Sequence, residues 1–219
     1  MAAVSARPKR RLDALRRPQI LGTAVELVRE KGLWNVRIAD VAKRAGVSPA
    51  NVVYYFGSKD QLFAQAIAEA DDAFYAPLHP ELATLDRAVD KLAWLMVRSS
   101  ESDWILWMDL WGYTRRHPET ASAQSAFHRR WRATIAEVIR YGQARGEWGE
   151  CAADDIAQRM SALTDGLAVH MVLGDPDHTR ERCVEMTLVA AALELGCSLR
   201  ELRAAAAKCP AHRQQKGQS

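Results

Sequence analysis

The sequence predicts an all-α fold of about nine helices, divided into an N-terminal helix-turn-helix domain and a larger C-terminal helical domain. Apolar residues recur at spacings of three and four, no window alternates apolar and polar residues for long, and glycines follow the periodic segments. The 219 residues are 48% hydrophobic and 26% charged, which suits one compact domain or two small ones. The longest apolar stretches, such as 188–193, fall far short of the ~18–20 residues that cross a bilayer. We therefore expect a globular protein without a transmembrane segment.

The N-terminal part begins with residues 1–17, which are rich in Ala, Arg and Lys, show no apolar period, and are expected to form a flexible basic arm. Pro18 suits a first helical turn and Gly32 a C-terminal cap, so the first helix is expected between them. Further helices are expected over 38–45, 49–56 and 58–75. Because Gly46 ends one short helix and Ser48 can cap the next, the pair is typical of a helix-turn-helix.

The C-terminal part follows a loop marked by Pro77 and Pro80. Segments with helical spacing cover 85–97, 104–113, 121–144, 156–173 and 183–195. Residues 199–219 are expected to form a C-terminal tail with a helical beginning and a frayed polar end. These patterns place the helix-turn-helix domain at 18–62 and the larger helical domain at 63–198.

Charge is distributed unevenly between the two parts. Residues 1–62 contain 12 Lys and Arg against five Asp and Glu, whereas the rest contains 18 against 22. Clustered positive charge favours a polyanionic partner for the N-terminal part alone, because basic side chains at phosphates release counterions. The alternative is a solvated basic tail without a partner.

Cysteine and histidine usage indicates a reducing compartment and no cofactor. The four cysteines form no CxxC pair, and the basic N-terminus lacks the apolar core of a secretion signal, so a cytoplasmic location is expected. His117 and His128 are separated by Pro118 and lack further ligands nearby in the sequence. We therefore predict no metal site, and no nucleophile elbow or phosphate-binding loop is present.

The segment 36–63, VRIADVAKRAGVSPANVVYYFGSKDQLF, resembles the DNA-binding signature of the TetR family of bacterial transcriptional regulators. The resemblance extends over roughly residues 18–70. It implies double-stranded DNA as a partner, with the third helix in the major groove and the flanking residues on phosphates. The residues it assigns to DNA are Arg37, Ser48, Pro49, Ala50, Asn51, Tyr54, Tyr55 and Lys59.

Side-chain chemistry separates these residues into two roles. Asn51, at the exposed start of the third helix, is the side chain there that can pair bidentately with adenine, so we assign it to base readout. Hydroxyl and ammonium groups at the phosphate positions set register rather than sequence. Two positions depart from the family pattern: Arg37 stands where a Ser or Thr cap is usual, and Val53 where an aromatic residue is common.

Six of the seven tryptophans follow the small domain, and Trp104, Trp107 and Trp111 share one helical face. This face is either plain core or the wall of a small-molecule pocket. The segments 107–111, 142–148 and 165–168 also resemble the C-terminal domain of the BetI-like branch, and this resemblance does not fix a ligand. Candidate ligand-binding residues are Trp104, Trp107, Met108, Trp111, Trp131, Asp165 and His170. The acids near these tryptophans are Glu101, Asp103 and Asp109. They would either meet an organic cation or be solvated at the surface.

The helix over 183–195 places Val184, Leu188, Ala191 and Leu195 at intervals of four, three and four, a spacing that suits a helix-pair dimer interface. The TetR resemblance implies the same, since the family's last two helices usually form a four-helix bundle across a two-fold axis. The alternative is an internal core helix.

Together these features predict a homodimeric regulator that binds a palindromic operator and is released by a small-molecule effector. Two other classes remain open. One is an enzyme that uses the aromatic cavity, although no catalytic constellation is evident. The other is a ligand-binding or partner-binding module without DNA-binding activity, which the intact Tyr54, Tyr55 and Lys59 argue against.

Overall fold

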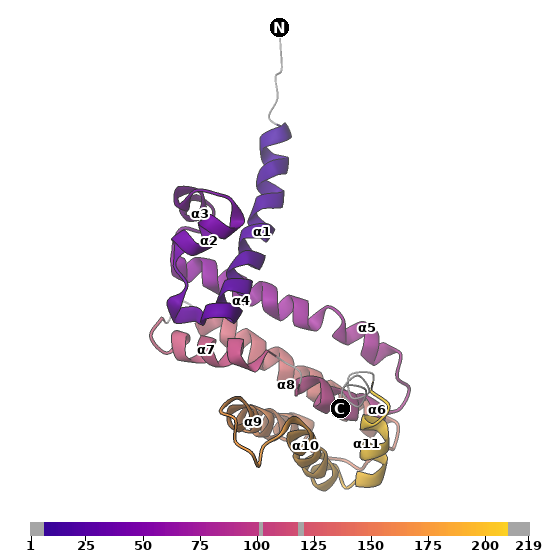
Figure 1. The fold of residues 1–219 in the computed structure, drawn as a ribbon. Coiled ribbons are helices and arrows are strands. Elements are labelled where there is room, and N and C mark those ends of the chain that lie inside the picture. Colours follow the sequence, from indigo (N-terminus) through magenta and orange to yellow (C-terminus); the bar gives the residue numbers. More distant parts are fainter. Residues whose placement is uncertain (1–6, 101–102, 118–120, 210–219) are drawn as a thin grey trace. The chain divides into compact units, whose positions relative to one another are not determined.

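The computed structural model describes residues 7–100, 103–117 and 121–209, and this part of the chain is entirely helical (Figure 1). Its helices are α1 (Arg7–Lys31), the 3₁₀ helix η1 (Leu33–Asn35), α2 (Ile38–Ala45), α3 (Pro49–Phe56), α4 (Lys59–Tyr75), α5 (Leu78–Ala83), α6 (Ala88–Ser99), α7 (Trp104–Thr114), α8 (Ala121–Ala144), α9 (Ala153–Val172), α10 (Arg180–Leu195) and α11 (Leu199–Ala206). The all-α prediction is confirmed. Within the described residues, no helix has the length and apolar character needed to span a membrane.

The chain divides into two compact units. Unit 1 consists of Met1–Ala73 and Ile105–Ser125, and unit 2 of Phe74–Trp104 and Ala126–Ser219. Unit 1 therefore combines the helix-turn-helix with most of α7, and the boundary expected after Leu62 falls inside α4.

Unit 1 is built around the apolar stripes of α1 to α4. Ile20, Leu27, Val41, Phe56 and Leu62 are all nearly inaccessible to solvent. Polar contacts tie α7 to the same unit: Asp109 Oδ2 accepts a hydrogen bond from the backbone N–H of Leu33 at 2.8 Å, and the Tyr113 hydroxyl donates to Asp60 Oδ1. The aromatic ring of Tyr113 also packs edge-on against Phe63, 5.9 Å between centroids.

The N-terminal helix is longer than the sequence predicts. α1 begins at Arg7 and contains Pro18, so the part of the expected flexible arm over 7–17 is helical, while residues 1–6 lie outside the described chain. Arg, Lys, Leu and Ala are good helix formers, and this outweighs the hydrogen bond to the Ala14 carbonyl that a proline cannot donate.

One helix, α5, occurs where a loop was expected, and another, α11, confirms the helical beginning that the sequence predicts for the tail. Pro80 lies within α5, whose Leu78 and Leu82 are buried. α11 occupies the beginning of the expected tail and packs against α6 through buried Leu202, Ala205 and Ala206. A proline in a first turn forgoes a donor that has no partner there, so it does not prevent α5. The frayed end predicted for the last residues lies outside the described chain.

In unit 2, Glu147 and Trp148 follow α8 and make hydrogen bonds to α6 and α8. The Glu147 carboxylate accepts hydrogen bonds from the backbone N–H groups of Ala88 and Val89, at 2.8 and 3.1 Å, and thereby caps α6. The Trp148 indole donates to the Ile139 carbonyl at 2.8 Å and lies on Gly142, where an added Cβ would be 2.0 Å from the ring. The segment 142–148, which resembles the BetI-like branch in sequence, therefore has a structural role in unit 2.

Candidate functional site

The helix-turn-helix is formed by α2 and α3. Gly46 follows α2 as its C-cap in the left-handed conformation, with φ of +67°. The N–H of Val47 bonds to the Ala42 carbonyl at 3.0 Å. Ser48 Oγ then accepts the N–H of Asn51 at 3.1 Å and caps α3. The turn and the cap have the form predicted from Gly46 and Ser48.

The predicted DNA-contacting residues lie on the accessible side of α3 and beside it. Pro49 and Ala50 are exposed, Tyr54 is 80% exposed, and Asn51 and Tyr55 are half-buried. The inner positions Val52 and Phe56 are buried. Because Ser48 uses a lone pair in the cap, its O–H remains available as a donor.

Two basic predicted contacts flank α3. Arg37 precedes α2 and is exposed, and its backbone N–H donates to Asp40 Oδ2 at 2.9 Å. Asp40 thus supplies the reciprocal half of a capping box at a helix start that has no Ser or Thr hydroxyl. Lys59 begins α4 with its Nζ 5.3 Å from the centre of the Phe63 ring, and burial lowers the pKa of this ammonium below its ordinary value.

The neighbouring helix α7 reaches the residue next to Lys59. His117 Nδ1 lies 3.3 Å from Asp60 Oδ1, the acceptor for the Tyr113 hydroxyl, and the two rings stack at 3.9 Å. His117, considered above as a metal ligand, thus takes part in a polar cluster of unit 1.

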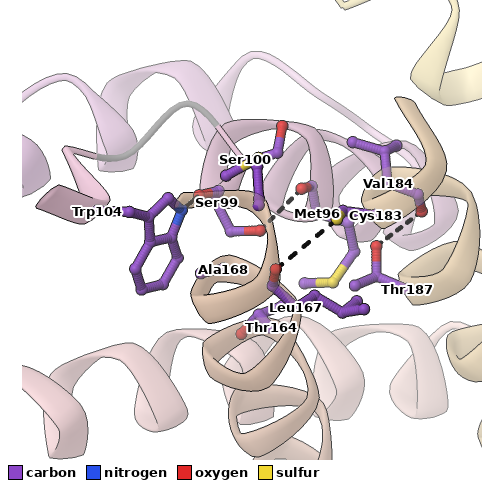
Figure 2. Close-up of a pocket in the computed structure, with 11 residues that line it drawn as sticks. Met96, Ser99, Ser100, Trp104, Thr164, Leu167, Ala168, Cys183, Val184 and Thr187 are labelled. Atoms are coloured by element: carbon purple, nitrogen blue, oxygen red, sulfur yellow. Dashed lines mark hydrogen bonds between the residues drawn. The ribbon is translucent and has the colours of Figure 1, made fainter. Parts of the chain in front are cut away.

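Unit 2 contains a small pocket of about 20 Å³ (Figure 2). It lies between the end of α6, the first residue of α7, the C-terminal half of α9 and the N-terminal half of α10. Its lining residues are Met96, Ser99, Ser100, Trp104, Thr164, Leu167, Ala168, Met171, Cys183, Val184 and Thr187.

The hydroxyl groups of this pocket donate to the backbone of their own helices. Ser99 Oγ donates to the Met96 carbonyl at 2.8 Å, and Thr187 Oγ1 to that of Val184 at 2.7 Å. Ser100 Oγ donates to the Val97 carbonyl at 2.7 Å, and Thr164 Oγ1 donates to the Ser161 carbonyl at 2.8 Å. The hydroxyl protons are therefore engaged, and the oxygens present acceptor lone pairs.

Trp104 is fixed in orientation at one wall. Its Nε1 donates to the Ser99 carbonyl at 2.9 Å, and the ring is 7% exposed. Among the described lining residues no side chain carries a formal charge at neutral pH, while Glu101 lies outside the described residues.

Of the predicted ligand-binding residues, the structure brings only Trp104 to this pocket. Trp107, Met108 and Trp111 follow it on α7 but belong to unit 1, where Trp107 is buried. Asp109 binds the Leu33 N–H there. The three tryptophans are spaced along one face of α7, as the sequence predicts. They do not share the pocket, because Trp104 belongs to unit 2 and the rest of α7 to unit 1.

The other three predicted ligand-binding residues lie elsewhere in unit 2. Trp131 packs on Phe74 with ring centres 6.1 Å apart. Asp165 Oδ2 lies 3.9 Å from His128 Nδ1, and burial raises the pKa of this carboxyl from 3.8 to about 6. His170 is exposed and stacks on His178 at 4.4 Å.

The predicted dimer residues are internal. Val184, Leu188, Ala191 and Leu195 are 1–7% exposed in a single chain, on the side of α10 that packs on α9, α6 and α11. Their spacing identifies an apolar stripe without saying which helix covers it, and the chain itself covers this one. The outward side carries Met186, Val189, Ala190 and the 80% exposed Leu193.

The outward side of α9 continues this apolar surface. Ala162 and Gly166 are exposed and small, Val169 is 36% exposed, and Leu173 is 76% exposed. α9 and α10 pack side by side (Figure 1). Sequence periodicity missed these residues because the outward stripe is weaker than the internal one.

Comparisons with known proteins agree with this geometry. The family model "Bacterial regulatory proteins, tetR family" matches residues 20–66, and "BetI-type transcriptional repressor, C-terminal" matches residues 82–196, more than half of the chain. The chain belongs to the TetR family of bacterial transcriptional regulators. As a member of this family it is a ligand-responsive DNA-binding regulator.

Individual TetR-family relatives cover most of the chain. The HTH-type transcriptional regulator BetI of Rhizobium meliloti (strain 1021) is 27% identical over 191 residues, which are 82% of this chain and 89% of that protein. A transcriptional regulator from Saccharomonospora viridis, solved in complex with choline, is 29% identical with a TM-score of 0.73, over 80% of this chain and 94% of that one. A TetR regulator from Haloarcula marismortui, 20% identical with a TM-score of 0.75 over 83% and 99% of the chains, shares the fold.

Proposed function

We propose that this TetR-family protein is a homodimeric repressor that binds a palindromic operator through α3 and releases it when a small organic molecule enters the pocket of unit 2. The observation that carries the proposal is the course of α7. Trp104, its first residue, lines the pocket, and Asp109 and Tyr113 hydrogen-bond to Leu33 and Asp60 in the helix-turn-helix unit. A displacement of Trp104 would therefore be passed along α7 to its hydrogen bonds with the helix-turn-helix unit.

For DNA recognition, we assign base readout to Asn51 with Pro49 and Ala50 allowing close approach of α3 to the groove. The exposed position of this first turn supports the assignment. Phosphate contacts fall to Ser48, Tyr54, Tyr55, Arg37 and Lys59, which offer hydroxyl, guanidinium and ammonium donors. A two-fold symmetric dimer would place two such helices on two half-sites, which is why we expect a palindrome.

The effector is expected to widen this pocket as it enters. Its apolar surface would contact Met96, Leu167 and Met171, and the hydroxyl oxygens and the Trp104 ring would set its orientation. Choline is the first candidate, because the Saccharomonospora viridis relative was solved with it. A quaternary ammonium would be held by the face of the indole.

A binding titration tests the position of the effector site. Choline is titrated into the full-length protein and followed by calorimetry. Trp104→Leu removes the indole face and should weaken binding by about 2- to 30-fold, the range expected for a cation–π contact of about 0.5–2 kcal/mol. Trp131→Leu, the same change at a buried tryptophan outside the pocket, is the matched control.

Equal losses in both variants, or a loss in Trp131→Leu alone, would move the site away from this pocket. Should Trp104→Leu fail to fold by circular dichroism, Thr187→Val removes one pocket oxygen at constant size and takes its place. If the wild type did not bind choline, choline would be excluded as the effector. The same variants would then be titrated with other small organic amines and alcohols.

The link through α7 has its own test. Tyr113→Phe removes the hydrogen bond to Asp60 and leaves the pocket unchanged. Effector affinity should therefore stay at the wild-type value, while the effector-induced loss of operator affinity, about 5- to 150-fold for a typical coupling, should shrink. An undiminished response in this variant would mean that the signal passes by another route.

For the dimer, we propose the outward apolar surface of α9 and α10, which extends from Leu193 at one end of the helix pair to Leu173 at the other. Leu193→Glu would bury a charge from each protomer in this apolar interface and should yield monomers at micromolar concentration by light scattering. Ile105→Glu, at a 57% exposed aliphatic residue on α7, is the control and should remain dimeric. Leu188→Glu should instead unfold the chain, because Leu188 is 2% exposed within it.

We further propose that the protein acts in the cytoplasm, where its DNA lies, and that it catalyses no reaction. In support, the described residues of the pocket provide no acid or base, and burial raises the pKa of the Cys183 thiol, which disfavours a thiolate nucleophile. Turnover of a bound effector by the purified protein would contradict this.

A further inference from the structure

The connection between α9 and α10 gathers three side chains with no part in DNA or effector binding as proposed above. His170 lies in the last turn of α9, and Asp175 and His178 lie in the short loop before α10. Gly174, with φ of +74°, reverses the chain, so that the N–H of Asp175 bonds back to the His170 carbonyl at 3.1 Å. The turn therefore brings residues five and eight positions apart into one cluster.

The carboxylate oxygen of this cluster lies at ligand-like distances from both imidazoles, and binding a shared ion requires the exposed His170 ring, which stacks on His178 at 4.4 Å, to turn out of that stack. Asp175 Oδ2 lies 3.3 Å from His170 Nδ1 and 2.9 Å from His178 Nδ1, and one ligand atom from each residue falls within 4.8 Å of the others. Two ligands at about 2.0–2.2 Å from a shared ion, at angles near 90–110°, are roughly 2.9–3.5 Å apart. Both distances from the carboxylate oxygen fall in that range.

The backbone holds the carboxylate in this position. Asp175 Oδ1 accepts the N–H of Asp177 at 3.0 Å, and the Asp175 carbonyl accepts the N–H of His178 at 3.0 Å. One carboxylate oxygen is thus fixed by the loop while the other faces the two imidazoles. Such support outside the ligand set is what orients the ligands of protein metal sites.

From this geometry we infer that His170, Asp175 and His178 form a binding site for a divalent transition-metal ion, with Zn²⁺ as the representative. Two imidazole nitrogens and one carboxylate oxygen suit Zn²⁺ and its neighbours, whereas Mg²⁺ and Ca²⁺ prefer oxygen ligands alone. Three protein ligands leave a fourth tetrahedral position for water. His170 is 54% exposed, which gives an ion access from solvent.

The inference departs from the sequence-based prediction of no metal site. Neither the spacing of five and three residues nor the lone aspartate resembles a common zinc motif, so the cluster becomes visible only after the turn at Gly174 is formed. It stands independently of the proposed repressor function, since ion binding needs neither DNA nor effector.

The test uses the full-length protein, stripped with a chelator and reduced. Co²⁺ replaces Zn²⁺ as a spectroscopic probe, and Zn²⁺ affinity is measured by competition with a chromogenic chelator. We expect one tight site per chain, visible Co²⁺ bands without a thiolate charge-transfer band, and affinity at least about tenfold weaker in His170→Gln and Asp175→Asn. His79→Ala, at an exposed histidine on α5, should bind as the wild type does.

Unchanged affinity in His170→Gln would overturn the inference, and so would a thiolate band, because it would place the ion on a cysteine. An equal loss in His79→Ala would indicate non-specific binding to exposed histidines and would likewise overturn it. His170→Gln alters an exposed side chain, so this variant keeps the test decisive even where Asp175→Asn disturbs the loop.

Discussion

Replacing Asp165 by asparagine should stabilise the protein at neutral pH. Burial raises the pKa of this carboxyl from 3.8 to about 6, against a smaller opposing effect of Arg132. Each pKa unit corresponds to about 1.4 kcal/mol, so keeping Asp165 charged in the folded state costs about 3 kcal/mol. Because the folded-state pKa lies above the unfolded one, this cost is absent below about pH 4 and grows until about pH 6. Asparagine keeps the shape of the side chain without the charge.

Urea denaturation of the wild type and Asp165→Asn, at equal protein concentration, measures the difference at several pH values. At pH 7 the variant should be more stable by up to about 3 kcal/mol relative to its difference at pH 4, a rise in Tm of roughly 6–12 °C. Glu137→Gln, at an exposed carboxylate on α8, is the control and should show little pH-dependent difference. A constant difference between pH 4 and 7, or a gain at low pH only, would refute the buried-charge explanation.

Three other substitutions have distinct expected outcomes. Lys59→Ala should weaken binding to operator and random duplex by similar factors and reduce the salt dependence, measured by fluorescence anisotropy; a loss confined to the operator would contradict a phosphate role. Asn51→Ala should lower discrimination at one base pair by about 1–3 kcal/mol, and an unchanged preference across randomised sites would remove Asn51 from readout. Gly142→Ala should destabilise the protein by about 1–3 kcal/mol in thermal denaturation, because its methyl group meets the Trp148 ring; wild-type stability would show that this contact relaxes freely.

Helical periodicity was sufficient for most of the fold, and the residues of the turn were sufficient for the helix-turn-helix. Gly46 forms a left-handed turn and Ser48 caps α3 with its side chain. Both features depend on neighbouring residues in the sequence, so they can be predicted without knowing how the helices pack. Proline proved a weaker signal. Pro18 lies inside α1, where the neighbouring helix formers outweighed one lost hydrogen bond. Pro80 lies in the first turn of α5, where a backbone donor has no partner to lose.

The pocket and the α9–α10 surfaces could not be predicted in the same way. An apolar stripe such as Leu188 and Leu195 marks a covered face, but the covering partner depends on the positions of other helices. The pocket collects single hydroxyls such as Ser99, Thr164 and Thr187 from three helices, none of which stands out in its own segment. Three tryptophans on α7 dominated the sequence, yet only the first of them lines that pocket.

The cap that Glu147 provides for α6 has a consequence for synthesis on the ribosome. Ala88 and Glu147 are 59 residues apart, so at about 5–20 residues per second roughly 3–12 s pass before the carboxylate is available. α11, which packs on α6, is translated later still. During this interval the apolar side chains of α6, including Leu92, Leu95 and Met96, have no permanent cover. The nascent chain therefore presents α6 as a segment that chaperones can bind until translation has passed the end of α11.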